Sequence, residues 1–299
     1  MSASNIADYG IIGPGSIGLL WAVKLRAAHS VALWGRSGPM GLSLEFMQGE
    51  TISESFTFEP RGRAPGTALV TTKAYDTVRA LDGAIKRWRQ PPRAIVLFQN
   101  GVGSQDEVQQ RFDHIPLLAV STTEGANRTA DGALVHAGSG LTRLGPLNAS
   151  GAVWAEKIGA DFCAAGFDTR LETDIRIALW EKLLINAGIN AFTVLLDCPN
   201  GALRGHSFFE AQLPPLCYEL AVVSQASGYP ASAEIIEARI RTVAEKTAGN
   251  ISSMLQDVRS GRPTEINVIN GAVVRAGITL GIATPVNRML ADAVAARTR

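Results

Sequence analysis

The first half of the chain alternates short apolar runs with helical segments. Five runs rich in aliphatic residues are predicted to be strands: Tyr9–Ile12, Ser30–Trp34, Ala68–Thr71, Ala94–Phe98 and Leu117–Ser121. Apolar residues at helical spacing follow two of these runs, at about Leu19–Ala28 and Tyr75–Arg87. Strands that alternate with helices are typical of a parallel sheet with crossover helices, so the pattern predicts an α/β fold.

Two parts of the first half depart from this alternation. Residues 43–59 alternate polar and apolar side chains, which predicts a hairpin insertion rather than a further parallel strand. The Gly- and Pro-rich segment Arg61–Gly66 closes this insertion. Further along, the runs Ala133–Ala137 and Thr142–Leu144 are expected to finish the sheet, and a helix is expected at about Val153–Ala165.

From about Thr173 the pattern of period two disappears and only helical periodicity remains. Turn sequences containing Gly and Pro interrupt it at Pro199–Gly201, Gly228–Pro230 and Gly261–Pro263. The sequence therefore predicts an α/β domain over residues 1–172 and an all-α domain over residues 173–299, with a hinge near residues 171–174.

One predicted helix of the second half carries a polar stripe. In the mostly apolar segment Leu179–Asn190, the residues Lys182, Asn186 and Asn190 follow one another at four-residue spacing. At roughly 100° per residue they drift by only about 80°, so one ammonium and two carboxamides share one side of the helix. The stripe either faces solvent or lines a cleft for a polar ligand. The apolar continuation Ala191–Leu196 favours the cleft, because buried amides need partners.

A glycine-rich turn lies between the first predicted strand and the first predicted helix. It reads Gly13-Pro14-Gly15-Ser16-Ile17-Gly18. In this context Gly13 permits a tight turn, Gly15 lets a pyrophosphate approach the backbone, and Gly18 lets the helix pack on the strand. The free N–H groups and the dipole of the helix amino terminus favour phosphate. We therefore predict a dinucleotide site here; the alternative is a glycine turn without a ligand.

Three polar residues near the ends of predicted strands bear on the cofactor. Arg36 stands where an NAD site usually carries an acidic residue for the ribose 2′-hydroxyl. Because a guanidinium matches a 2′-phosphate, NADP(H) is predicted, with a surface arginine as the alternative. Lys73 and Asn100 follow two further strands, at the sheet edge where open parallel sheets bind ligands. Their alternative role is that of ordinary turn residues.

The composition of the chain bears on its ligand and on its cellular compartment. Lys and Arg number 28 against 27 acidic residues, a net charge of +1, so we expect a small-molecule ligand and no nucleic acid. Cys163, Cys198 and Cys217 lack the spacing of a metal site and are expected to be buried thiols in a reducing cytoplasm. We expect no secretory signal and no membrane-spanning segment.

With these residues in place, the sequence resembles the ketopantoate reductase family (2-dehydropantoate 2-reductase), NADPH-dependent enzymes of the pantothenate pathway. The likeness runs nearly end to end through motifs in the family's order: the Gly13–Gly18 turn, Lys73-Ala74, Asn100-Gly101, Trp180–Asn190, Asn200–Leu203, Asn250–Asp257 and Thr264–Gly271. The last two are the most specific. The resemblance implies a Rossmann-like amino-terminal domain, a helical carboxy-terminal domain and an active site in the cleft between them.

The resemblance also implies roles for individual residues. Lys182 matches the catalytic lysine that gives a proton to the substrate oxygen as hydride reaches the carbonyl carbon. Glu265 matches a glutamate of the site, with catalytic and cofactor-binding roles. The substrate-binding positions are matched by Asn100, Asn186, Asn190, Asn200, Asn250 and Ser253. The cofactor positions are matched by the Gly13–Gly18 turn, Arg36, Lys73, Asn100 and Ala126.

The chemistry expected from the residues agrees with these roles. Hydride addition to a 2-keto acid develops alkoxide charge, which an ammonium stabilises and then neutralises. The pKa of a lysine in water is about 10.4, so burial should lower the pKa of Lys182, and Glu265 nearby should oppose that shift. NADPH carries the redox step, and no metal is expected.

Two departures from the family pattern leave the substrate open. Glu124 stands where relatives often have an aromatic residue or histidine, close to the expected nicotinamide site, and Gln99 stands where some relatives have histidine. Besides ketopantoate reduction, two hypotheses stay open: a reductase of the same family for another small 2-keto acid, and a non-catalytic NADP(H) sensor. The resemblance also leaves a homodimer open.

Overall fold

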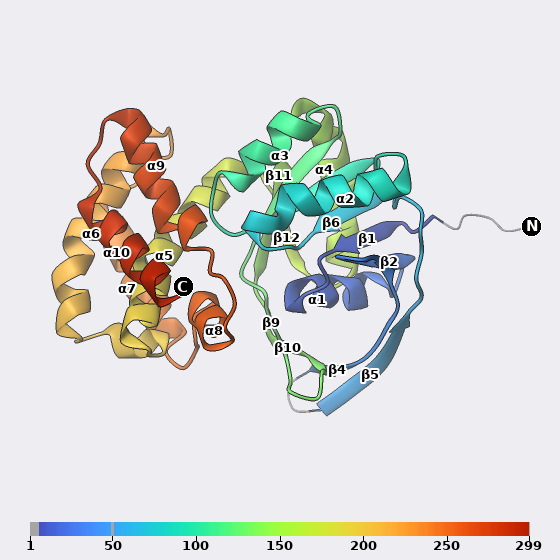
Figure 1. The fold of residues 1–299 in the computed structure, drawn as a ribbon, viewed down its shortest axis with the longest axis horizontal. Helices are drawn as coiled ribbons and strands as arrows, with labels where there is room; N and C mark the ends of the chain where they lie inside the picture. The colour runs from blue at the N-terminus through green and yellow to red at the C-terminus, as the bar shows by residue number, and fades with distance from the viewer. Residues whose placement is uncertain (1–5, 49–50, 299) are drawn as a thin grey trace, which may run out of the picture. The chain divides into compact units, whose positions relative to one another are not determined.

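An eight-stranded sheet organises the first half of the structure, a computed structural model that describes residues 6–48 and 51–298 (Figure 1). Its order is β12-β11-β8-β7-β6-β1-β2-β3. The strands are β1 (Tyr9–Ile12), β2 (Val31–Gly35), β3 (Gly38–Met40), β6 (Thr67–Val70), β7 (Ala94–Leu97), β8 (Leu117–Thr122), β11 (Leu141–Pro146) and β12 (Asp168–Leu171). The five predicted strands form its parallel centre, from β8 to β2.

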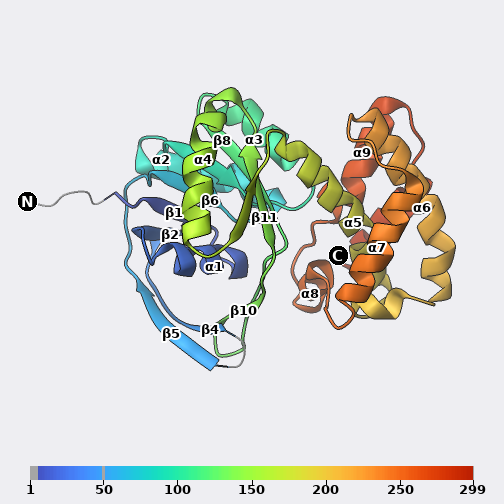
Figure 2. The same ribbon diagram turned by 180° about the vertical axis from the view of Figure 1, so that it is seen from behind.

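Helices cover both faces of this sheet (Figures 1 and 2). They are α1 (Ser16–Leu25), α2 (Thr77–Trp88), α3 (Ser104–Phe112) and α4 (Ala149–Ala164). α1 and α4 share an aromatic cluster in which Trp21 stacks on Phe167 and meets the edge of Phe162. α3 was not predicted, because its sequence is largely polar and only Val108 and Phe112 supply buried apolar side chains.

A smaller sheet, of order β5-β4-β10-β9, stands beside the large one. Its strands are β4 (Leu42–Gln48), β5 (Thr51–Phe58), β9 (Gly125–Arg128) and β10 (Leu134–Gly138). β4 and β5 form the predicted hairpin. The expectation that the run at 133–137 finishes the main sheet is wrong, since β10 pairs with β4 and β9. A strand pattern indicates an extended segment but not its distant partner, and the short strand β12 was missed altogether.

From α5 onward the described chain is helical, as predicted. The helices are α5 (Ile175–Leu196), α6 (Ser207–Ala226), α7 (Ala233–Lys246), α8 (Ser253–Arg259), α9 (Asn270–Leu280) and α10 (Pro285–Arg297), with short 3₁₀ turns η2 (Asn200–Leu203) and η3 (Ile266–Val268). Their core is apolar, with Phe192, Phe209 and Leu290 fully buried. The α/β fold with an all-α second part is thereby confirmed.

The chain divides into two compact units. The first unit extends to Gln99 and resumes over Ser104–Ala178; the second comprises Asn100–Gly103 and Leu179 onward. The division after Ala178 falls inside α5. The predicted boundary after residue 172 and the predicted hinge near 171–174 stay predictions.

Two expectations from composition meet the structure here. α5 is long and apolar enough to cross a membrane by length and composition, but 67% of its apolar window is buried inside the structure, so core packing explains its apolarity.

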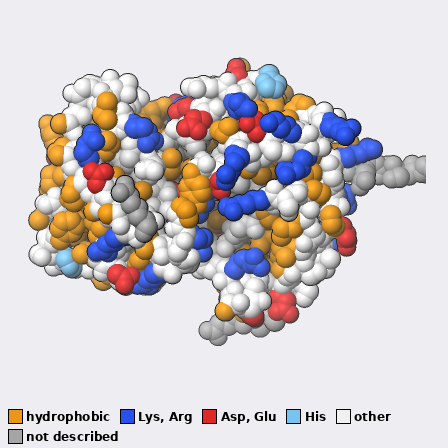
Figure 3. All heavy atoms as spheres, viewed as in Figure 1, with side chains coloured by type: hydrophobic (Ala, Val, Ile, Leu, Met, Phe, Trp, Pro, Cys, Tyr) orange, Lys and Arg blue, Asp and Glu red, His pale blue; other side chains and the backbone are white. Residues whose placement is uncertain are grey.

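The expectation of three buried thiols is wrong: Cys217 is buried, Cys198 is partly exposed and Cys163 is exposed. On α4 the preceding residue, Phe162, takes the inward position and turns Cys163 outward. On the face shown in Figure 3, acidic and basic side chains are interspersed.

Candidate active site

In the first unit, residues 13–15 connect β1 to α1, and residues 16–18 begin α1. Gly13 has a φ of +80°, which side chains of L residues rarely adopt, and its N–H donates to the carbonyl of Trp34 at 3.0 Å. A Cβ at Gly18 would lie 2.3 Å from Thr71 Oγ1, whereas a Cβ at Gly15 would meet nothing nearer than 4.0 Å. Gly13 and Gly18 are therefore required by the fold, and the backbone at Gly15 is open to a ligand.

The same turn leaves the amino terminus of α1 without a side-chain cap. Gly15 is the N-cap residue, and no side chain caps the first N–H groups of this ten-residue helix. Pro14, Ser16 and Ile17 are only partly buried around it. An uncapped helix amino terminus beside an open backbone fits the pyrophosphate of a dinucleotide.

Arg36 lies directly after β2, with a side chain that is 91% exposed. Its Nη2 donates to Asp76 Oδ2 at 3.3 Å, and Asp76 also forms an ion pair with Arg79. An exposed guanidinium with one long contact can turn toward a ligand phosphate at little cost. No local sequence pattern indicated Asp76, whose carboxylate would compete with a phosphate for Arg36.

Lys73 begins the short helical turn Ala74–Asp76 that follows β6. The segment before it is held by Gln99, whose Nε2 donates to Val70 O at 2.8 Å and to Thr72 O at 3.0 Å. Gln99 is buried, and these two bonds give it a structural role. It fixes the path of the chain that leads to Lys73.

Ala126 lies on β9, and its register partner on β10 is His136. His136 Nε2 lies 2.6 Å from Glu124 Oε2, and both side chains are almost fully buried. The carboxylate of Glu124 is thus used within this unit, next to the strand that carries Ala126. Nothing in the sequence pattern indicated His136, because its contact with Glu124, 12 residues earlier, forms only when β10 pairs with β9.

The polar stripe of α5 lies in the second unit. Lys182 and Asn186 are partly exposed, and Asn190 is buried. Burial of the ammonium lowers the pKa of Lys182 to about 8, and the negative charge of Glu265 opposes this shift. Both directions agree with those expected. Lys182 is therefore still mainly protonated at neutral pH, yet far more acidic than a lysine in water, as a proton donor requires.

Glu265 lies just before η3 and is buried in the second unit. Asn100 Nδ2 donates to Glu265 Oε2 at 3.4 Å. The segment Asn100–Gly103 follows β7 in sequence but belongs to the second unit, where Val102 N–H donates to Val268 O at 3.1 Å. The structure therefore groups Asn100 with Glu265 and Lys182. The sequence pattern predicts that Asn100 follows a strand and meets the cofactor or substrate, but it does not predict Glu265 as its neighbour.

The remaining predicted substrate residues lie around η2 and α8. The N–H of Asn200 donates to Asn250 O at 3.0 Å, and Asn200 Nδ2 donates to Thr247 Oγ1 at 2.8 Å. Asn200 Oδ1 is buried and has no hydrogen-bond partner among the described atoms. Ser252 caps α8 through its Oγ, which leaves Ser253 exposed at the start of that helix. Asn250 is also exposed.

The predicted residues thus fall into two groups, one in each unit. The first unit brings together the glycine turn and the segment leading to Lys73, and separately carries Arg36 and Ala126. The second unit brings together Lys182, Glu265 and Asn100, and joins Asn200 to Asn250. One unit thus has an open glycine turn at a helix amino terminus, with the geometry that a dinucleotide requires, and the other has an acidic lysine beside carboxamides.

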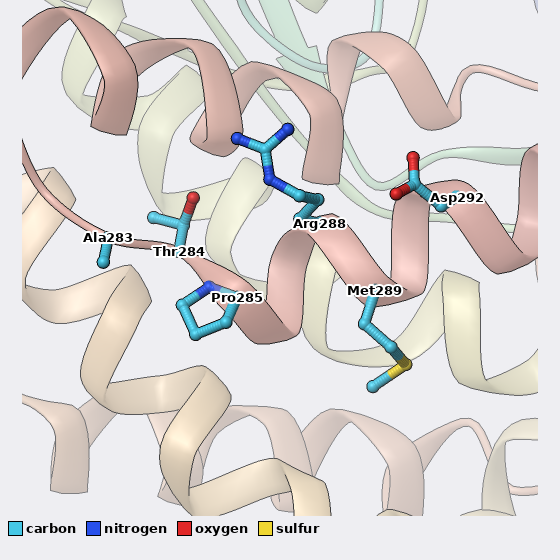
Figure 4. A pocket seen from close by; sticks show the side chains of 6 residues that line it. All are labelled: Ala283, Thr284, Pro285, Arg288, Met289 and Asp292. Atoms are coloured by element: carbon cyan, nitrogen blue, oxygen red, sulfur yellow. The ribbon is translucent and has the colours of Figure 1, made fainter.

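Two surface hollows lie outside both groups. One is on α3, lined by Asp106, Gln109, Gln110 and Asp113. The other is at the start of α10, where Arg288 and Asp292 extend from one side of the helix and Met289 from the other (Figure 4). Neither contains a predicted site residue. Among the residues described, no group of three or more His, Cys, Asp or Glu side chains could hold a metal ion.

Comparison with known proteins gives a consistent result. The family model described as ketopantoate reductase PanE/ApbA matches residues 9–149, and that described as its C-terminal domain matches residues 174–298. A 2-dehydropantoate 2-reductase of Vibrio cholerae is 36% identical over 287 residues, which cover 94% of each chain.

Two solved structures share the fold along almost the whole chain. A PanE/ApbA family ketopantoate reductase from Ralstonia eutropha aligns with a TM-score of 0.85 and 24% identity, covering 97% of this chain and 98% of that one. A D-mandelate dehydrogenase, solved in ternary complex with NADH and anilino(oxo)acetate, aligns with a TM-score of 0.86 and 21% identity, covering 97% of each.

Proposed function

The chain belongs to the ketopantoate reductase PanE/ApbA family, and we propose that it catalyses the NADPH-dependent reduction of 2-dehydropantoate (ketopantoate) to pantoate. The observation that carries this proposal is the environment of Lys182, a partly buried residue on the polar side of α5 whose ammonium is buried and lies near the negative charge of Glu265. A sensor that only bound NADP(H) would need the glycine turn but no such proton donor.

The reaction requires a proton at the substrate oxygen and a hydride at the carbonyl carbon. When bound, NADPH supplies the hydride from its nicotinamide. Lys182 stabilises the negative charge that develops on the oxygen and then transfers its proton to it, which leaves a hydroxyl group and a neutral amine. The amine regains a proton from solvent before the next turnover.

Neutral polar groups orient the substrate in this proposal. Asn186 and Asn190 present carboxamides on the same side of α5 as Lys182, and Ser253 presents a hydroxyl at the start of α8. Asn200 offers a buried carboxamide oxygen that has no partner among the described atoms, and Asn250 lies beside it. Such groups hydrogen-bond a carboxylate and a hydroxyl without adding charge, and so hold the carbonyl in one orientation.

The cofactor residues fit NADPH in the same proposal. The backbone of residues 13–18 holds the pyrophosphate, and Arg36 exchanges its long contact with Asp76 for the 2′-phosphate. Further cofactor contacts in the proposal are Lys73, Ala126, Asn100 and Glu265. The proposal places the enzyme in the cytoplasm with a small molecule as its substrate, and a homodimer stays a prediction.

The direct test follows the loss of NADPH absorbance with ketopantoate, beside pyruvate and 2-ketoisovalerate, and repeats each assay with NADH. Turnover that is fastest with ketopantoate and NADPH supports the proposal. A higher kcat/KM with another 2-keto acid would move the assignment to a reductase of the same family with a different substrate.

Replacing Arg36 with alanine is expected to raise the KM for NADPH about tenfold and to leave the KM for NADH nearly unchanged, since a charge-assisted contact to an exposed group is worth about 1.5 kcal/mol. The comparison of the two KM values checks this. Lys86→Ala, an exposed cation on α2, is the matched control and should change neither. An equal rise for NADPH and NADH in Arg36→Ala would show that Arg36 does not read the 2′-phosphate.

Replacing Glu265 with glutamine is expected to shift the alkaline limb of the pH–rate profile to lower pH. The reductive reaction needs protonated Lys182, so activity is present below the pKa of about 8 and is lost as pH rises through it. Glu265 raises the pKa of Lys182, and glutamine removes that effect while keeping the shape of the side chain. The measurement is log kcat against pH, with Glu245→Gln, an exposed partner of Arg204, as the control. If the alkaline limb does not move, Glu265 does not influence the pKa of the group that donates the proton.

A further inference from the structure

A chain of hydrogen bonds crosses the apolar core of the second unit. Asn270, the first residue of α9, donates from Nδ2 to Ala187 O on α5 and to Asn287 Oδ1 on α10, both at 3.1 Å. Asn287 Nδ2 in turn donates to Glu219 Oε2 on α6 at 2.8 Å. Asn270 and Asn287 are completely buried, and Glu219 is 5% exposed.

At one end of this series of hydrogen bonds, Glu219 and Asn287 cap a helix. Glu219 accepts hydrogen bonds from the N–H groups of Val286 at 2.7 Å and Asn287 at 2.9 Å, in the first turn of α10. The N-cap residue of α10, Thr284, makes no side-chain cap of its own. A carboxylate at a helix amino terminus is favourable, so Glu219 and Asn287 are explained as the cap of α10.

Capping of α10 does not explain why Asn270 is buried in the core. Its Oδ1 is buried and has no hydrogen-bond partner among the described atoms, which is unfavourable for an amide and would be avoided by an apolar residue. Its other bond goes to α5, to the carbonyl of Ala187, which directly follows Asn186 of the polar stripe. The carboxamide therefore ties the helix of Lys182 to the start of α9.

The start of α9 is continuous with the turn that carries Glu265. Val268 N–H donates to Glu265 O at 3.0 Å, and Ile269 N–H donates to Ile266 O at 3.2 Å, so the five residues before Asn270 form one tight turn. The turn is also held from its other side, by Val102 N–H on Val268 O. Arg275 Nη1 adds a bond to Asn267 O at 2.8 Å.

We propose that Asn270 is a positioning residue that holds the turn of Glu265 against α5 and thereby sets the separation of Glu265 from Lys182. Asn270 touches neither substrate nor cofactor in this proposal; it acts through Glu265. The inference rests on the proposed function, in which Lys182 is the proton donor.

The test compares Asn270→Ala with Glu219→Gln in the full chain. Asn270→Ala removes both donations, so kcat with ketopantoate is expected to fall about 10- to 100-fold. The KM for NADPH is expected to change much less, because Glu265 is one of several proposed cofactor contacts and the others lie mainly in the first unit. The alkaline limb of its kcat profile is expected to move to lower pH, as for Glu265→Gln, because Glu265 recedes. Glu219→Gln weakens the cap of α10 and leaves the bond between Asn270 and Ala187, so it is expected to lower Tm and to keep kcat and the limb.

A merely structural role would give a different outcome. Asn270→Ala with a lower Tm but an unchanged kcat and limb would overturn the proposal, and so would an equal shift of the limb in Glu219→Gln. Should Asn270→Ala fail to fold, Asn270→Ser, whose hydroxyl can donate one bond, is expected to show the same changes in smaller degree. Wild-type protein that binds NADPH but turns over no 2-keto acid would instead refute the proposed function.

Discussion

Replacing Lys182 with alanine is expected to lower kcat for ketopantoate by about 10²- to 10⁴-fold, the usual contribution of a general acid. Burial and Glu265 together bring the pKa of Lys182 to about 8, so the wild-type residue can both stabilise the developing alkoxide and give up its proton near neutral pH. The glycine turn and Arg36 lie in the other unit, so the affinity for NADPH should be kept. Steady-state kinetics and a titration of NADPH fluorescence measure the two quantities.

Two companion variants sharpen this prediction. Lys182→Arg keeps the positive charge but stays protonated, so it should remain far below wild type if proton transfer matters and recover activity if charge alone suffices. Lys246→Ala removes an exposed lysine at the end of α7 and should have no effect. If Lys182→Ala turned over ketopantoate nearly as fast as wild type, a group other than Lys182 would be the proton donor.

Replacing Gly101 with alanine is expected to destabilise the second unit by about 3 kcal/mol or more, from backbone strain and overpacking together. Gly101 has a φ of +77°, and a Cβ there would lie 2.1 Å from the carbonyl oxygen of Val268. Relief requires the segment of Asn100 to move away from the turn of Glu265. Activity should therefore fall together with Tm, as thermal unfolding and turnover of the same preparation would reveal.

Gly205 offers a matched control for this substitution. Its φ is +78°, almost the same as that of Gly101, but a Cβ there would meet nothing within 4 Å. Gly205→Ala is expected to cost only about 1 kcal/mol, the strain of the backbone conformation alone. Similar losses of Tm in the two variants would mean that the contact of Gly101 with Val268 contributes little in solution.

Much of the candidate site could be found from local sequence patterns. The turn at residues 13–18 needs glycine for a positive φ and for close packing on Thr71, and both needs leave a mark on the sequence itself. The stripe of Lys182, Asn186 and Asn190 follows from the helical repeat. The lowered pKa of Lys182 could be expected from burial and from Glu265, although the motif resemblance, not spacing, brought Glu265 to attention.

Other parts of the site depend on partners far apart in the chain. No local pattern pairs Glu124 with His136, or brings Asp76 to Arg36, because each contact depends on how separate segments pack. The run at 133–137 was correctly predicted to be a strand but assigned to the wrong sheet, for the same reason. Asn270 belonged to a recognised motif, yet its bond to Ala187 spans 83 residues.

By itself, the sequence determined the class of fold, the glycine turn and the polar side of α5, because turn geometry and helical periodicity are properties of neighbouring residues. Only the tertiary structure decided that Asn100–Gly103 belongs with the helical unit and that Glu265 accepts from Asn100. It alone revealed the amide chain that ties α9 to α5. These features arise when distant segments bury their polar groups together, and the need of each buried group for a partner selects the arrangement.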